Sequence, residues 1–302
     1  MIDKRFIVLQ HRGVLSVAGE DRVSFLQGLV SNDVTKAGPN RAIYSALLTP
    51  QGKFLHEFFI VALQDRLLLD AEAARIDDLR KRLLLYKLRS KVSVEVAAGM
   101  AVAAVLGEGV AADFHLPNEA GAAAPFESGV AFVDPRLAAA GLRVLMDGDE
   151  LPDAISRRFC AAGTLPEYDR HRLALGLPDG SRDLPVEKAI LLENGFDELH
   201  GIDWQKGCYM GQELTARTRY RGLVRKRLMP VRIDGPLPAP GTPIMLGEAE
   251  AGEMRSGIDG LGLAMIRLEQ FEKAATADAA FTAGDSRLRP VKPDWAVFPA
   301  AE

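Results

Sequence analysis

The segment KGCYMGQE, residues 206–213, holds the residues of this sequence best suited to chemistry. Cys208 lies there two residues after Lys206, and the stretch that follows, GQELTARTRYR, has the composition of a helix. A helix beginning near Gly211 would place Cys208 just ahead of free N–H groups and a positive dipole end, which together with Lys206 would favour a thiolate. A structural turn whose cysteine fills a small hole explains this segment equally well.

The neighbours of the thiol suit the start of a helix. Gln212 and Glu213 fall in the first predicted turn, where an acid interacts favourably with the dipole and both side chains can cap. Gly207 and Gly211 permit positive φ angles or close approaches that a side chain would forbid. The other cysteine, Cys160, is predicted to be a small buried residue on a helix.

A basic run follows the thiol segment and is open to two interpretations. It could bind a polyanion, either RNA phosphate or the polyglutamate tail of a folate. It could equally be a solvated surface with ion pairs. Within eleven residues, and interleaved with Tyr220, the run contains Arg217, Arg219, Arg221, Arg225, Lys226 and Arg227.

Composition narrows the class of protein. The chain has 302 residues and a formal net charge of -4, which gives no global attraction to nucleic acid or anionic membrane. Two cysteines cannot form a disulfide framework, and five scattered histidines argue against a dedicated metal site. The start, MIDKRFIVLQHRGVL, lacks the layout of a targeting segment, and the apolar run at 96–107 is too short for a membrane helix. We therefore expect a cytoplasmic, soluble protein.

The elements that must position the thiol are predicted from periodicity and turn residues. Apolar spacing indicates a helix at 23–30, and Pro50, Gln51 and Gly52 predict a hairpin turn between two apolar strands. The layer at about 42–98 combines strands and a helix, so the fold class is α+β, plausibly ferredoxin-like. The remaining predicted elements are a strand at 66–71, helices at 74–88, 152–163 and 166–176, and a strand at 90–97.

The last quarter of the chain has a different pattern. After Arg227, short apolar runs alternate with Pro and Gly turns, which is typical of a small antiparallel barrel or sandwich. The segment 99–141 is rich in Ala and Gly and shows no usable periodicity. We therefore expect a multi-domain chain with one region at 1–227 and a C-terminal β-barrel domain at 228–302.

The thiol segment also carries a family resemblance. KGCYMGQE followed by LTAR resembles the signature of the YgfZ family of folate-binding proteins, which is similar to the T-protein (aminomethyltransferase) of the glycine cleavage system. DRVSFLQGLVSNDV, LLTPQGKF and KPDW resemble other parts of that family. The resemblance implies three domains in a ring around a central hole that the tetrahydrofolate site faces. It also implies a role in maturing or repairing iron–sulfur proteins, with downstream effects on tRNA thiolation.

The resemblance implies roles for individual residues. The family's functional cysteine corresponds to Cys208, with Lys206 beside it. The T-protein glutamate that binds the pterin ring corresponds to Glu187, because a carboxylate can accept two adjacent N–H donors. A tyrosine bordering the folate corresponds to Tyr44. Further cofactor-binding positions are expected at Gly207, Tyr209, Gly211, Gln212, Glu213 and Arg217.

One departure from the T-protein pattern bears on catalysis. T-proteins carry two adjacent aspartates after the hairpin, where this chain has His56 and Glu57. If His56 replaces the first aspartate, ordinary aminomethyl transfer is in doubt, although a neutral imidazole could still act as a base.

The favoured hypothesis is a tetrahydrofolate-binding accessory factor for assembly or repair of iron–sulfur proteins that acts through Cys208. A folate-dependent aminomethyltransferase or one-carbon transferase is the first alternative, and a tRNA- or polyanion-binding module is the second. The expected partners are folate and iron–sulfur client or assembly proteins, with no membrane and no direct nucleic-acid contact.

Overall fold

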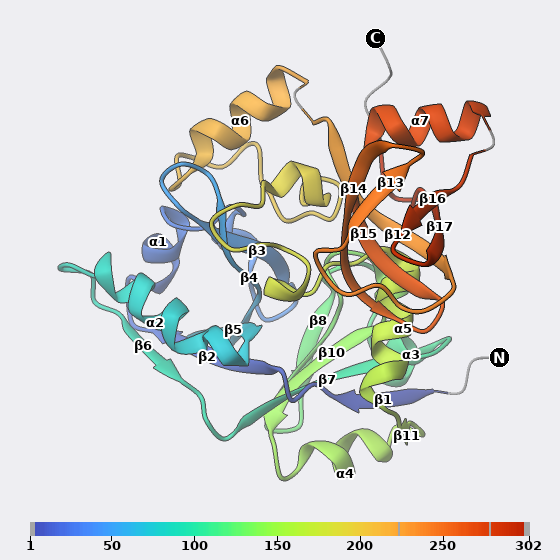
Figure 1. Ribbon diagram of the computed structural model, residues 1–302. Helices are drawn as coiled ribbons and strands as arrows, with labels where there is room; N and C mark the ends of the chain where they lie inside the picture. The colour runs from blue at the N-terminus through green and yellow to red at the C-terminus, as the bar shows by residue number, and fades with distance from the viewer. Residues whose placement is uncertain (1–3, 223, 278, 299–302) are drawn as a thin grey trace.

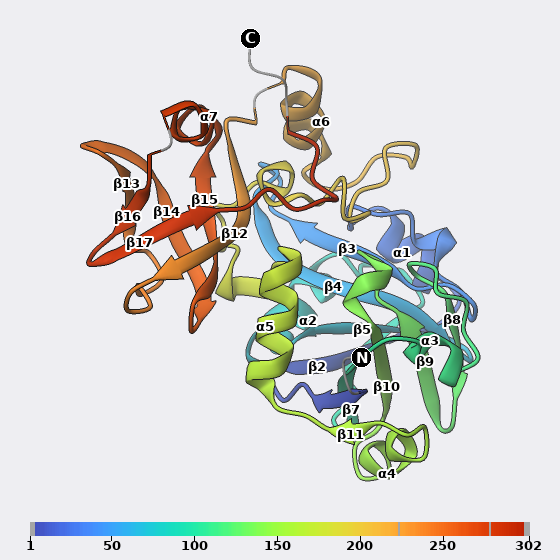
Figure 2. The ribbon, with the colours of Figure 1, turned by 90° about the vertical axis from the view of Figure 1, so that its right-hand side faces the viewer.

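The computed structural model describes residues 4–222, 224–277 and 279–298. Its strands form a five-stranded sheet, a six-stranded sheet and a closed barrel (Figures 1 and 2). No helix in these three ranges is long and apolar enough to cross a membrane. Short 3-10 helices connect the larger elements, at Val34–Lys36 (η1), Ala73–Arg75 (η2), Ala138–Ala140 (η3), Gly180–Arg182 (η4) and Leu191–Asn194 (η5).

The five-stranded sheet has the antiparallel order β3-β4-β5-β2-β6. The predicted hairpin is confirmed, since β3 and β4 pair around residues 49–53 with Tyr44 opposite Phe59 and Leu47 opposite His56. Helices α1 and α2 cover one face of this sheet through a shared apolar cluster. The bounds are Arg12–Ala18 (β2), Ile43–Leu48 (β3), Phe54–Leu63 (β4), Arg66–Glu72 (β5), Ser93–Val96 (β6), Arg22–Gln27 (α1) and Ile76–Leu85 (α2).

The six-stranded sheet, ordered β11-β1-β7-β10-β9-β8, is formed largely by the segment that showed no periodicity. Strands β7 and β9 are almost wholly buried, so their sequences do not alternate between apolar and polar residues. The bounds are Arg5–Val8 (β1), Met100–Leu106 (β7), Ala123–Phe126 (β8), Gly129–Val133 (β9), Leu142–Asp147 (β10), Ala161–Ala162 (β11), Val110–Asp113 (α3), Leu151–Ser156 (α4) and Leu165–Leu175 (α5).

The helix predicted at 152–163 is too long. Helix α4 ends at Ser156, and Phe159 has a φ of 61°, a value that a right-handed helix excludes. Cys160 therefore lies outside the helix, directly before β11. Its burial is as predicted, with 3% of its surface exposed, and that burial raises the pKa of its thiol.

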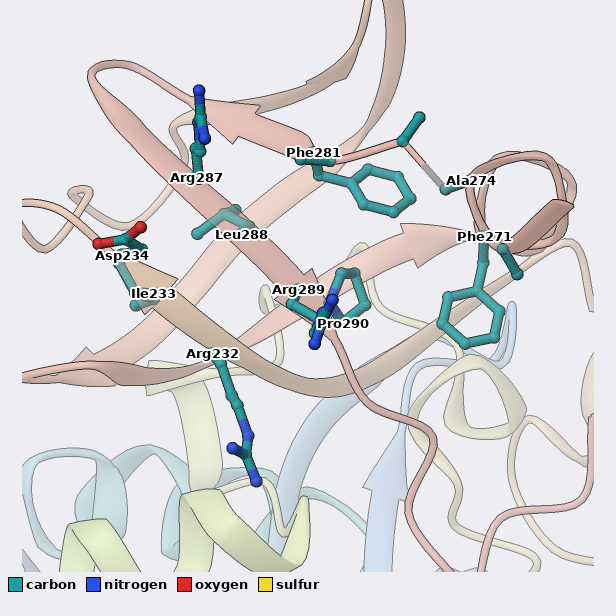
Figure 3. A pocket seen from close by; sticks show the side chains of 13 residues that line it. Arg232, Ile233, Asp234, Phe271, Ala274, Phe281, Arg287, Leu288, Arg289 and Pro290 are labelled. Atoms are coloured by element: carbon teal, nitrogen blue, oxygen red, sulfur yellow. The ribbon is translucent and has the colours of Figure 1, made fainter. Parts of the chain in front are cut away.

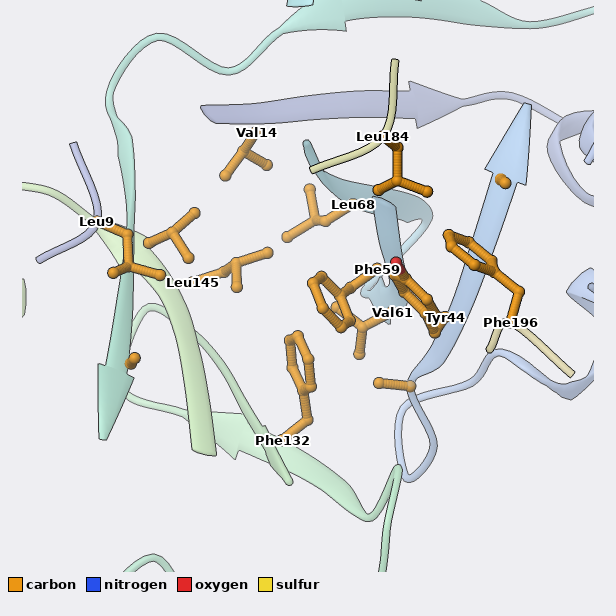
Figure 4. Close-up of a cluster of buried hydrophobic side chains, with 14 of the residues drawn as sticks. Leu9, Val14, Tyr44, Phe59, Val61, Leu68, Phe132, Leu145, Leu184 and Phe196 are labelled. Atoms are coloured by element: carbon orange, nitrogen blue, oxygen red, sulfur yellow. The ribbon is translucent and has the colours of Figure 1, made fainter. Parts of the chain in front are cut away.

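The core lies between the two open sheets (Figure 4). Tyr44 stacks on Phe196 with ring centroids 4.9 Å apart, and Phe59 packs between Tyr44 and Phe132. Burying one such ring stabilises a fold by about 1.5–3 kcal/mol. These aromatic side chains fill the space between the two open sheets.

The C-terminal strands close into the predicted antiparallel barrel, in the order β12-β15-β14-β13-β16-β17. A cavity of about 570 Å³ lies on the side of the barrel near α7, and Figure 3 shows its lining side chains, which include Phe271, Phe281 and three arginines. The bounds are Lys226–Asp234 (β12), Pro243–Leu246 (β13), Ala249–Ile258 (β14), Leu261–Arg267 (β15), Phe281–Ala283 (β16), Ser286–Pro290 (β17) and Leu268–Ala277 (α7).

Candidate functional site: an exposed thiol ahead of a helix

The residues 203–211, here called the thiol loop, lead into helix α6, which spans Gln212–Tyr220. Cys208 is exposed and lies four residues before the first residue of α6, close to where the sequence placed it. Gly211 has a φ of 81°, and a Cβ there would lie 2.6 Å from the carbonyl oxygen of Thr49. Gly52 in the hairpin turn would likewise clash, with Leu214. The hairpin turn and the start of α6 thus touch backbone to backbone, which fixes where the thiol loop ends.

The buried side chain of Lys206 anchors the thiol loop to the rest of the protein. Its ammonium donates to the carbonyl oxygens of Gln27, Val30 and Asn32 at 2.8, 2.6 and 2.8 Å, so all three N–H donors are used. Burial lowers the pKa of Lys206 to about 8. Its expected catalytic role beside the thiol is therefore corrected, because the ammonium holds the loop on the end of α1.

A second anchor, Asp203, had no sequence signal. Its Oδ1 accepts the backbone N–H groups of Gln205 and Lys206 at 2.7 and 3.0 Å, and its Oδ2 pairs with Lys36 at 2.5 Å. Burial acts to raise the pKa of Asp203, but the hydrogen bonds from Lys36 and the loop backbone outweigh it and lower that pKa. An ionised Asp203 at neutral pH keeps the loop folded beneath Cys208.

The other motif residues are divided between the interior and the surface. Tyr209 is buried, with its pKa raised to about 12, and its ring lies 5.1 Å from the Lys206 ammonium. Gln212 accepts the Tyr209 N–H at 3.4 Å. A Cβ at Gly207 would meet nothing within 4 Å, so the expected close approach is wrong there. Glu213 is exposed on the first turn of α6.

The basic run does not form one patch. Arg227 is buried and pairs with Glu198 at 2.5 Å, while Lys226 lies 3.6 Å from Glu193. Arg219 places its guanidinium 4.1 Å from the centre of the Trp204 ring. The exposed residues of the run that lie on α6 or directly after it are Arg217, Arg219, Tyr220 and Arg221.

Glu187 and Tyr44 do not come together as a folate site. The Glu187 side chain is 62% exposed and faces Arg82 of α2, with Oε1 and Nη2 separated by 3.6 Å. Tyr44 is fully buried, and burial raises the pKa of its phenol well above the usual value. The predicted pterin role of Glu187 stays a prediction: its carboxylate is exposed beside Arg82, whereas Tyr44 is buried.

Strand alternation separates His56 from Glu57. Successive residues of β4 point to opposite faces, so Glu57 shares the face of Tyr44 while His56 points to the helix side. His56 Nε2 lies 2.9 Å from Asp78 Oδ2, and burial lowers the pKa of His56 to about 4. His56 therefore does not occupy the position expected for the central T-protein aspartate, and that expectation is wrong. Glu57 is the residue that faces the interior between the sheets.

Glu57 belongs to a buried charge network between the sheets. Arg12 donates to Glu57 and, at 2.6 Å, to Asp70, which also accepts from Arg143 at 2.7 Å. The Arg143 guanidinium lies 3.9 Å from the centre of the Phe59 ring. Burial raises the pKa of Glu57, although Arg12 opposes this. One Glu57 oxygen and the Tyr44 hydroxyl are buried without a hydrogen-bond partner among the described residues.

This network leaves no space for a folate. The cavity between Asp134, Arg143 and Tyr168 measures about 10 Å³, which is room for about one water at most. A second cavity, beside Tyr44 and Asp203, measures about 250 Å³, less than the roughly 300–1,000 Å³ of ordinary ligand pockets. Neither cavity therefore supports a folate site beside this network.

Comparison with known proteins first identifies the fold. Residues 225–298 match the family model of the CAF17 C-terminal β-barrel domain. The glycine cleavage system aminomethyltransferase T of Bartonella henselae superposes with a TM-score of 0.76 over 96% of this chain and 85% of its own, at 15% identity. This match confirms the expected T-protein-like fold with a C-terminal barrel.

Sequence relatives identify the family. The iron–sulfur cluster assembly factor IBA57 of mouse is 34% identical, covering 95% of this chain and 84% of the relative, and the human factor is 35% identical with the same coverage. The homologue of Mycosarcoma maydis is 33% identical over 89% of this chain and 75% of its own length.

These relatives are named as mitochondrial proteins, which contradicts the cytoplasmic location predicted from the sequence. The names of these relatives identify them as IBA57 proteins and do not use the YgfZ name. With 35% of residues identical over 95% of this chain and 84% of the human factor, the chain belongs to the IBA57 family of iron–sulfur cluster assembly factors.

Proposed function

We propose that this protein takes part in the assembly or repair of iron–sulfur proteins by offering Cys208 as a thiolate ligand to a cluster in transit. The observation that carries the proposal is an exposed thiol on a loop held by two buried anchors, Lys206 and Asp203. Fixed backbone beneath a free sulfur presents a ligand without the cost of ordering a mobile loop.

The number of thiols decides what Cys208 can do. An ordinary cluster is held by four thiolates, whereas Cys160 is buried in the core of the six-stranded sheet and Cys208 alone is exposed. The chain therefore supplies one ligand, and the remaining ligands come from a carrier or client protein. When Cys208 binds iron its thiol proton passes to solvent, and the exchange of one ligand for another transfers no electrons.

Folate has no step in this mechanism. The T-protein-like fold suggests tetrahydrofolate, but Glu187 is exposed and the centre is filled, so aminomethyl transfer receives no support from the site. An effect on tRNA thiolation would follow indirectly, through the cluster-dependent enzymes that modify tRNA.

The test is complementation of a strain that lacks its own copy of this protein. Cys208→Ser should fold normally yet fail to restore the activity of cluster-dependent enzymes, because a serine hydroxyl is a far weaker acid and iron ligand than a thiol. Cys160→Ser is the matched control, and it should reduce stability rather than specific function because it buries a hydroxyl. Full restoration by Cys208→Ser would refute the proposal.

A further inference from the structure

We propose that the outer face of α6 is the docking surface for an acidic face of the protein that shares a cluster with Cys208. This inference rests on the function proposed above and extends it to the partner's surface chemistry. The docking surface is defined by four residues: Glu213, Arg217, Tyr220 and Arg221.

A partner that shares a cluster with Cys208 must contact the protein surface beside α6. A stable protein–protein interface buries about 800 Å² on each partner, which corresponds to a disc of about 16 Å radius. Helix α6 has nine residues and is therefore about 13 Å long, beginning four residues after Cys208. A footprint centred on the thiol therefore reaches at least the start of this helix, which stands at the edge of the molecule (Figure 1).

Helical spacing separates the two faces of α6. Thr215 and Thr218 are buried against the rest of the protein. Glu213, Arg217 and Tyr220, at positions i, i+4 and i+7, share the opposite side and are exposed, and Arg221 follows directly after the helix. The outer side is thus free along its whole length among the described residues.

The chemistry of this side favours an acidic partner. Tyr220 is 80% exposed, and exposed Tyr and Arg are residue types that dominate binding energy at interfaces. Neither Arg217 nor Arg221 forms an ion pair with a described residue. Because the whole chain carries a formal charge of -4, the positive charge here is local to the thiol rather than a general property. Complementary acidic groups would speed association and set orientation.

A defined peptide probe tests the charge of this surface without knowledge of the natural partner. Two short cysteine peptides, flanked by Glu or by Lys, are prepared as mixed disulfides with thionitrobenzoate. The Cys208 thiolate attacks the peptide sulfur, forms a protein–peptide disulfide and releases coloured thionitrobenzoate. The acidic peptide should react about tenfold faster at low ionic strength, and salt should remove the difference.

Charge reversal identifies the residues responsible. Arg217→Glu with Arg221→Glu should abolish the preference for the acidic peptide, whereas Arg287→Glu with Arg289→Glu, on the exposed side of the barrel, should keep it. All four sites are exposed, and urea unfolding checks that both double variants remain folded. Equal rates for the two peptides with the unchanged protein would overturn the proposal.

The same variants in the complementation strain separate this inference from the proposed function. We expect the α6 double variant and Tyr220→Ser to lower cluster-dependent activity, with the barrel variant unaffected. If Cys208→Ser loses activity while the α6 double variant keeps it, the docking surface is wrong and the role of the thiol stands. If Cys208→Ser keeps full activity, both proposals fall.

Discussion

Replacing Lys206 by methionine tests whether the thiol loop is held by one buried ammonium. The side chains have similar length and shape, so the change removes the charge and three hydrogen bonds while leaving most of the packing. The three carbonyls that lose their donor belong to Gln27, Val30 and Asn32, where the chain leaves α1.

The magnitude is the difference between two opposing contributions. A buried carbonyl left without a donor costs about 1–3 kcal/mol, so three cost roughly 3–9 kcal/mol. Burial of the ammonium, which lowers its pKa to about 8, carries a penalty of about 3 kcal/mol that methionine relieves. The difference is roughly 0–6 kcal/mol, so Lys206→Met should lower the free energy of unfolding by about 3 kcal/mol.

Urea unfolding measures this loss, and hydrogen exchange locates it. The amides of residues 203–211 should exchange faster in Lys206→Met, because the loop opens without unfolding the sheets. The control is Lys226→Met, whose ammonium is 46% exposed and 3.6 Å from Glu193, and it should cost under about 1 kcal/mol. Unchanged stability and unchanged exchange of the loop in Lys206→Met would refute the anchoring argument.

Three further predictions concern residues around the site. Burial lowers the pKa of His56 to about 4, so the unfolded chain binds this proton at higher pH than the folded chain does. The free energy of unfolding should therefore fall as the pH drops from 6.5 towards 4. In urea titrations His56→Gln should remove up to about 3 kcal/mol of that fall. Gly211→Ala should cost about 2–4 kcal/mol in thermal unfolding while Gly207→Ala stays near neutral, and equal costs would contradict the packing described. Glu187→Gln should leave the affinity for tetrahydrofolate unchanged in calorimetric titration. An affinity that is tenfold weaker would show that Glu187 belongs to a folate site.

Local sequence signals predicted the elements that carry the site. The hairpin turn at 50–52 and the helix after Gly211 follow from glycines that only a turn or a helix start requires, and both are present. The barrel follows from Pro and Gly turns between short apolar runs. In each case the deciding interactions lie within a few residues along the chain, which is the range that periodicity can detect.

The functions of Lys206 and Glu187 depended on distant residues. The carbonyls that accept from Lys206 lie 174 to 179 positions earlier, so no local pattern distinguishes an anchoring lysine from one that activates the thiol. Glu187 was assigned by resemblance, and its position beside Arg82 depends on a contact between residues far apart along the chain. His56 could have been assigned correctly, because alternation along β4 places Glu57 on the same face as its cross-strand partner Ala46 and His56 on the other face.

The buried charge network between the sheets supports the proposal that the function depends on the exposed Cys208. Removing one partner from a buried charge pair costs about 3–5 kcal/mol, and Arg12 contacts three carboxylates while Asp70 contacts two arginines. A ligand entering between the sheets would have to break several of these contacts and separate the packed rings of Phe59 and Tyr44. The thiol loop meets no such barrier, since Cys208 is already exposed and its anchors point inward. A T-protein-like fold can therefore support a function based on contact with another protein, because the reactive side chains, and not the fold, determine the chemistry.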